Sequence, residues 1–129
     1  MRKRRETSDT LNSDILYRQS CGARMQHALR SLEGRWKLMI IAQLLAGPPM
    51  RFSDLERALP QISQKMLIQQ LRNLEKDNIV SRTVYPQVPP KVEYCLTEVG
   101  KGLRPVFAAL LIWAELQRSA NDKLSEPNR

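Results

Sequence analysis

Two helices joined by a tight turn are predicted for residues 51–76, RFSDLERALPQISQKMLIQQLRNLEK. Apolar residues recur at helical spacing between Phe52 and Leu59. Pro60 ends this first helix, because the residue before a proline is disfavoured in the helical region. Ser63 begins the second, since its hydroxyl can accept a hydrogen bond from an unpaired amide of the first turn. The pattern is that of a helix-turn-helix, and it constrains the rest of the chain more than any other feature.

The second helix has two chemically distinct faces. Its apolar side carries Met66 and three leucines, whereas Lys65, Gln69, Arg72 and Lys76 fall on the opposite side at ~100° per residue. Lysine and arginine bind phosphates or guanine edges, and glutamine pairs with the adenine edge. A face of this kind suits DNA, but it also occurs on ordinary helices that only contact solvent. The residues that follow the helix are needed to distinguish these two interpretations.

A β-hairpin is predicted directly after the second helix. Residues 79–85 are rich in β-branched side chains that alternate, and residues 91–96 return as a second strand after a proline-rich loop. A hairpin in this position is typical of a wing, which would lay Arg82 and Lys91 along a DNA backbone or minor groove. The net charge over residues 61–92 is +3.

The overall charge favours a polyanionic partner. The chain has 129 residues, which suits one domain, and its hydrophobic fraction of 42% excludes wholesale disorder. Twenty-one Lys and Arg residues against 13 Asp and Glu give a net charge of +8. A small basic domain most often binds nucleic acid, although acidic lipids and proteins also attract such surfaces.

Enzyme chemistry is not expected. No glycine-rich phosphate loop or paired carboxylates of an apolar pocket can be found, and the single His27 cannot complete a Ser-His-Asp or metal-binding set. We therefore expect no cofactor and no metal. Cys21 and Cys95 are too few for a disulfide framework. No apolar run approaches the roughly 18 residues of a membrane span. No hydrophobic segment follows the basic N-terminus, so we do not expect it to be a signal peptide. A cytoplasmic location is therefore expected.

The first 20 residues are expected to form a flexible basic arm with a short helical segment. Its cations would add phosphate contacts or enter a minor groove, or would only keep a mobile tail soluble. A helix is then predicted from Cys21, and another over residues 36–45, where apolar residues cover so much of the surface that it should support the core. Gly47 and two prolines end that helix.

A last helix is predicted after Thr97, whose hydroxyl can cap it. A wide apolar face on a terminal helix more often packs against another subunit than remains exposed. Residues 119–129 are expected to be a flexible tail. The residues expected at a dimer interface are Leu103, Val106, Phe107, Leu110, Leu111 and Trp113.

Residues 21–116 resemble the HxlR-type winged-helix transcriptional regulators, relatives of the MarR group. The most specific segments are ISQKML, PPKVEY and LTEVG. The resemblance implies a mainly α fold with a small antiparallel β-hairpin (α+β), a winged helix-turn-helix domain over residues 21–118, and a homodimer joined through its N- and C-terminal helices. It implies a palindromic operator, with half-sites about 34–36 Å apart. The DNA-binding positions would be Ser63, Gln64, Lys65, Ile68, Gln69 and Arg72 in the helix, with Arg82 and Lys91 in the wing.

Several members of this family sense oxidants or electrophiles through a cysteine near the N-terminus, and Cys21 occupies that position. A thiol at a helix start, flanked by Arg18 and Arg24, should favour the thiolate, which can be oxidised or alkylated. Such a change can shift a dimer between arrangements that do and do not bind DNA. The alternative is that Cys21 is a small buried hydrophobic residue at the dimer interface.

Three positions depart from the family pattern. Gly22 stands where proline is usual, Asn78 replaces a glycine, and Cys95 replaces a serine and is interpreted as structural. The sequence thus favours a DNA-binding regulator with an unidentified effector. The alternatives are a winged-helix module that binds protein without specific DNA binding, and a DNA-binding regulator without cysteine sensing.

Overall fold

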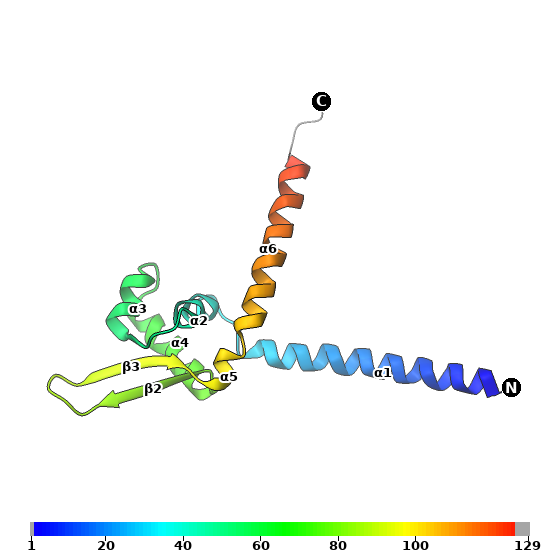
Figure 1. Cartoon of the computed structure of the whole chain (residues 1–129), viewed down its shortest axis with the longest axis horizontal. Helices are drawn as coiled ribbons and strands as arrows, with labels where there is room; N and C mark the ends of the chain where they lie inside the picture. The colour runs from blue at the N-terminus through cyan, green and yellow to red at the C-terminus, as the bar shows by residue number, and fades with distance from the viewer. Residues whose placement is uncertain (1, 126–129) are drawn as a thin grey trace. The chain divides into compact units, whose positions relative to one another are not determined.

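The computed structural model describes the backbone of residues 2–125 and the side chains of residues 13–125. Contacts between residues divide the chain after Arg35 into two units, which are described separately. The first unit contains α1 (Arg2–Arg30). The second contains, in order, α2 (Lys37–Leu45), β1 (Met50–Arg51), α3 (Phe52–Ala58), α4 (Gln64–Lys76), β2 (Val80–Tyr85), β3 (Lys91–Leu96), α5 (Glu98–Lys101) and α6 (Arg104–Ser125). Figure 1 labels all of them except the short strand β1.

The N-terminal segment differs from expectation, because α1 is one continuous helix through the arm expected over residues 1–20. Residues 2–30 contain no proline and only one glycine, Gly22, and a single glycine lowers helix stability without breaking the helix. Cys21 therefore lies inside a helix and does not begin one. The side chains of the basic run at residues 2–5 lie outside the described residues, so their part in phosphate contacts stays a prediction.

The helix-turn-helix prediction is confirmed by α3 and α4. α3 ends at Ala58, shortly before Pro60, and α4 begins after Ser63. Ser63 has an extended backbone, and its Oγ accepts a hydrogen bond from the Met66 amide at 3.2 Å. The predicted N-cap thus forms, and it sets the residue at which α4 starts.

The core of the second unit forms where α2, α3, α4 and the base of the sheet meet. Within α4, the buried residues are those of the predicted leucine stripe. The predicted core helix is confirmed as α2, which supplies three more buried apolar residues and ends before Gly47 at φ +130°. Fully buried side chains are Ile40, Ile41, Leu55, Leu67, Leu71 and Leu74.

The sheet has three antiparallel strands in the order β1-β3-β2, of which β2 and β3 are the predicted wing. The two-residue strand β1 was not predicted, because two residues show no alternation. It makes β3 the central strand, so that Tyr94 lies opposite Met50 on one side and Arg82 on the other. The base of the wing is therefore wider than the expected hairpin.

A hydrogen-bonded junction joins the end of α4 to the start of α5. Asn78 has φ 60°, which confirms the predicted left-handed cap. The Thr97 hydroxyl donates to the Asn78 carbonyl at 2.6 Å and accepts from the Gly100 amide at 3.0 Å. Gly100 is buried directly against the Ile79 carbonyl, with no room for a side chain.

The single last helix expected after Thr97 is instead two helices, α5 and α6. Pro105 explains the break, because a proline lacks an N–H and fits only in the first turn of a helix. A new helix therefore begins at Arg104. It continues to Ser125, so residues 119–125 of the expected flexible tail are helical, whereas residues 126–129 lie outside the described residues.

Replacing Gly100 by alanine should destabilise the second unit by about 1–3 kcal/mol, because a Cβ would overlap the Ile79 carbonyl and force the junction apart. The free energy of unfolding in urea, followed by circular dichroism, measures this. The matched control is Gly22→Ala, since nothing lies within 4 Å of a Cβ there. Equal stabilities of the two variants would contradict the tight junction.

Candidate nucleic-acid interface

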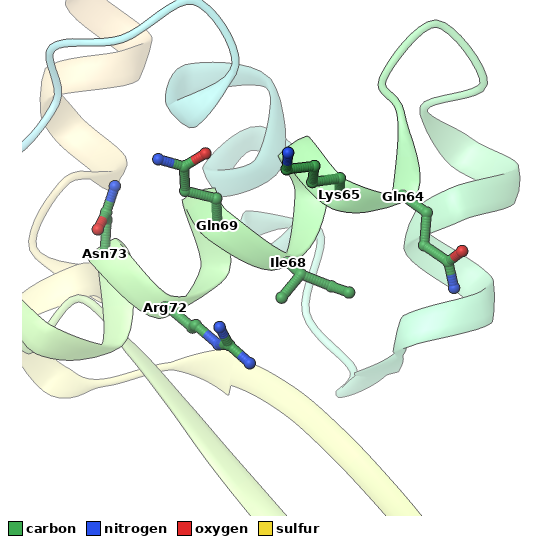
Figure 2. Close-up of a pocket in the computed structure, with 6 residues that line it drawn as sticks. All are labelled: Gln64, Lys65, Ile68, Gln69, Arg72 and Asn73. Atoms are coloured by element: carbon green, nitrogen blue, oxygen red, sulfur yellow. The ribbon is translucent and has the colours of Figure 1, made fainter.

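The exposed side of α4 forms a shallow concave surface. The apolar stripe of α4 is buried in the core, so the opposite side faces outward. Figure 2 shows the side chains that line this surface, with Arg72 directed toward the wing. Lys65, Gln69 and Arg72 are exposed, and Ile68 is half-buried. The lining residues are Gln64, Lys65, Ile68, Gln69, Arg72 and Asn73.

Five of the six helix positions expected to contact DNA line this surface together. The sixth, Ser63, is exposed at the start of α4, where its hydroxyl already caps the helix. Asn73 is a further lining residue that the sequence analysis missed. It follows Gln69 by four residues, so the same helical periodicity would have found it.

The two cations of the wing are already paired with acidic residues. Arg82 Nε lies 3.6 Å from Glu75 Oε1 of α4, and Lys91 Nζ lies 2.7 Å from Glu93 Oε1 on its own strand. The Lys91 ammonium also lies 5.1 Å from the centroid of the Tyr85 ring. The Arg82–Glu75 pair is long and partly exposed, and pairs of this kind contribute about 0–1 kcal/mol, so a competing phosphate can displace Glu75. Sequence reasoning missed both acidic partners.

A second groove lies between α4 and the wing. Its polar side chains are Gln64, Arg72 and Glu75 from α4, with Arg82 and Tyr94 from the strands. Burial raises the pKa of the Tyr94 hydroxyl, although the neighbouring Arg82 guanidinium partly opposes this. The hydroxyl is therefore protonated at neutral pH and can donate a hydrogen bond. The remaining lining residues are apolar: Phe52, Ile68, Leu71 and Val92.

The two cysteines have different surroundings. Cys21 is a half-buried free thiol inside α1, so the argument that a helix start favours its thiolate does not hold. Cys95 lies on β3 with its Sγ 3.1 Å from Ser81 Oγ on β2, a contact that supports the structural interpretation. No group of three or more acidic, histidine or cysteine side chains within the described residues could hold a metal ion.

The candidate dimer residues fall into two sets. Leu103 and Phe107 are half-buried within the protomer, whereas Val106, Leu110, Leu111 and Trp113 are exposed. Three of the exposed residues, Val106, Leu110 and Trp113, line one hollow on α6 together with Pro105 and Ala109. Leu111 is about 100° round the helix from Leu110 and lies outside this hollow.

No helix in the described part of the chain combines the length and apolarity needed to cross a bilayer.

The sequence model of the HxlR-like helix-turn-helix family matches residues 31–122 of this chain. An uncharacterized HTH-type transcriptional regulator of Methanothermobacter thermautotrophicus is 41% identical over 99 residues, which are 77% of this chain and 75% of that protein.

Two solved structures are similar to this chain in both sequence and fold. The redox regulator HypR in its reduced form is 41% identical with a TM-score of 0.71, and the match covers 78% of this chain and 98% of HypR. The reduced form of the transcriptional regulator YodB from Bacillus subtilis is 40% identical with a TM-score of 0.65, covering 82% of this chain and 96% of YodB. YodB has also been solved after diamide treatment and with quinone bound.

Proposed function

Because this chain belongs to the HxlR-like helix-turn-helix family of transcriptional regulators, we propose that it acts as a homodimer on a palindromic DNA operator. The observation that carries this proposal is the outward face of α4, where Lys65, Gln69 and Arg72 gather beside the wing. A helix of this kind enters the major groove, and the wing contacts the adjacent backbone. Membership of a family of DNA-binding regulators also argues against an enzyme.

Lys65 and Arg72 are proposed to make the principal contacts. Among residues 13–125 neither has an ion-pair partner, so both charges are available to DNA, in contrast to the paired cations of the wing. Gln64 and Gln69 would read adenine edges, and Ile68 would touch a thymine methyl. Arg82 and Lys91 would then bind phosphates beside this helix.

Replacing Lys65 or Arg72 by alanine should cost ~1–3 kcal/mol of operator binding where the side chain reads a base edge, and less where it meets a phosphate. Fluorescence anisotropy with DNA from upstream of the protein's own gene measures this. Lys123→Ala, near the end of α6, removes the same charge and should leave affinity unchanged. Variants of Lys65 and Arg72 that bind as tightly as the Lys123 control would contradict the contact assignment.

The homodimer is proposed from the apolar surface of α6. Val106, Leu110 and Trp113 are 41%, 43% and 57% exposed in the protomer, and they follow one another at helical spacing. An exposed strip of this kind is typical of a protein interface. Two copies related by two-fold symmetry would bury the strip and present both α4 helices to one operator.

Ala109 and Ala108 allow a matched test of the dimer, because both are exposed on α6 and only Ala109 lines the hollow. Ala109→Glu should weaken dimerisation at least about tenfold, since burying an unpaired carboxylate costs more than the ~1.4 kcal/mol of a tenfold change. Ala108→Glu should leave it intact. Sedimentation equilibrium reports both dissociation constants, and a reversed order would exclude this face.

We also propose that Cys21 makes the regulator responsive to oxidants or electrophiles. Support comes from HypR, described as a redox regulator, and from YodB, solved with quinone bound. Cys21 is half-buried and free, so an oxidant can reach its sulfur. Oxidation or alkylation there would change the packing of α1 and, through it, the competence of the dimer for DNA.

Cys21→Ser should abolish the loss of operator binding that diamide or a quinone causes in the wild type, while binding under reducing conditions stays the same. Cys95→Ser is the control and should respond to oxidant like the wild type, because its sulfur serves the sheet. A gel-shift series reads both. An unchanged oxidant response in Cys21→Ser would leave a DNA-binding regulator in which Cys21 is an interface residue.

A further inference from the structure

The groove between α4 and the wing brings three charged side chains and one tyrosine hydroxyl to one place. Arg72 and Glu75 come from α4, Arg82 from β2, and Tyr94 from β3. The charges of Arg72, Glu75 and Arg82 all act on the Tyr94 hydroxyl, so the four groups share one neighbourhood. The groove has a volume of about 530 Å³, which is ample for a phosphate group and the sugars beside it.

The only acidic side chain that lines the groove lies on one of its two cations. Glu75 Oε1 is 3.6 Å from Arg82 Nε, and the two side chains are 32% and 45% exposed. A pair this long and this exposed is weak. Arg72 precedes Glu75 by three residues, and within the described residues it has no ion-pair partner. The groove thus holds one paired and one unpaired guanidinium.

Carboxylate and phosphate oxygens accept the same hydrogen bonds from a guanidinium group. We propose that this groove binds one phosphate of the DNA backbone and that the Glu75 carboxylate stands in for that phosphate in the free protein. On binding, Arg82 exchanges Glu75 for the phosphate, while Arg72 and the Tyr94 hydroxyl donate to the same group. This inference rests on the proposed DNA-binding function, and it adds Glu75 and Tyr94 to that site.

The exchange has a consequence for affinity. Every duplex carries phosphates, so every duplex must break the Glu75–Arg82 pair before Arg82 can bind it. Glu75 therefore lowers binding to all DNA, and only a site that also satisfies the base contacts of α4 is held tightly. The carboxylate that Arg82 leaves behind takes up a cation, which offsets part of the counterion release from DNA.

The test compares Glu75→Gln with Glu98→Gln, which removes the same charge from a glutamate on α5 that pairs with Lys101. Binding to a short duplex of random sequence is measured by fluorescence anisotropy between roughly 50 and 200 mM salt. Glu75→Gln should bind about fivefold tighter at low salt, because the weak pair no longer competes. Its plot of log K against log salt should be steeper by up to about 0.9. Glu98→Gln should match the wild type.

Two further variants test the route through the groove. In an Arg82→Ala background, Glu75→Gln should give no gain, because the cation that Glu75 occupies is absent. Tyr94→Phe should weaken binding without changing the salt dependence, since a hydroxyl donates a hydrogen bond but carries no charge. Circular dichroism spectra of all variants control for folding.

Glu75→Gln behaving like Glu98→Gln would overturn the proposal, as would a gain that persists without Arg82. The proposed function is judged separately by the wild type in the same titrations. Wild-type binding with a silent Glu75→Gln would remove only this inference. Absence of salt-sensitive wild-type binding to any duplex would remove the DNA-binding function and the inference together.

Discussion

Burial of three leucines in α4 is the constraint on which the candidate site depends. Leu67, Leu71 and Leu74 are at most 1% exposed, and burying each contributes about 1.5–3 kcal/mol. Turning the helix by one residue, about 100°, would expose them and bury charged side chains in their place. The rotation of α4 is therefore fixed by its apolar side. Lys65 and Arg72 owe their outward positions to the leucines opposite them.

Features that depend on neighbouring residues could be predicted from the sequence. The caps at Ser63, Asn78 and Thr97 each follow from one side chain and the backbone next to it. The alternation of β2 and the periodicity of α4 are equally local. β1 could not be predicted, because its two residues become a strand only by pairing with β3. The continuity of α1 could not be predicted, because the sequence indicates a flexible basic arm and a separate helix that begins at Cys21.

The part of the candidate DNA-binding site that depends on neighbouring residues could also be predicted, whereas the part that depends on tertiary packing could not. Helical periodicity placed Lys65, Gln69 and Arg72 on one face without any knowledge of the fold. The pair between Glu75 and Arg82 joins a helix to a strand, and its existence depends on how the wing packs against α4. In the sequence alone, nothing distinguishes Glu75 from the other acidic residues. Only the three-dimensional arrangement shows that Glu75 lies beside Arg82, a cation that the sequence led us to expect at the DNA.

The two-residue strand β1 divides the wing into mechanically different parts. Near its base, β3 has a neighbour on each side, and Arg82 pairs with Tyr94 at this level. Toward the tip only β2 and β3 remain, and Lys91 pairs there with Tyr85. A two-stranded ribbon is less stable by itself than a sheet of three strands, and it twists more strongly. In the proposed complex with DNA, Arg82 would therefore lie on the better supported part of the wing, whereas Lys91 would lie near the two-stranded tip and could follow differences in groove width from one DNA site to another.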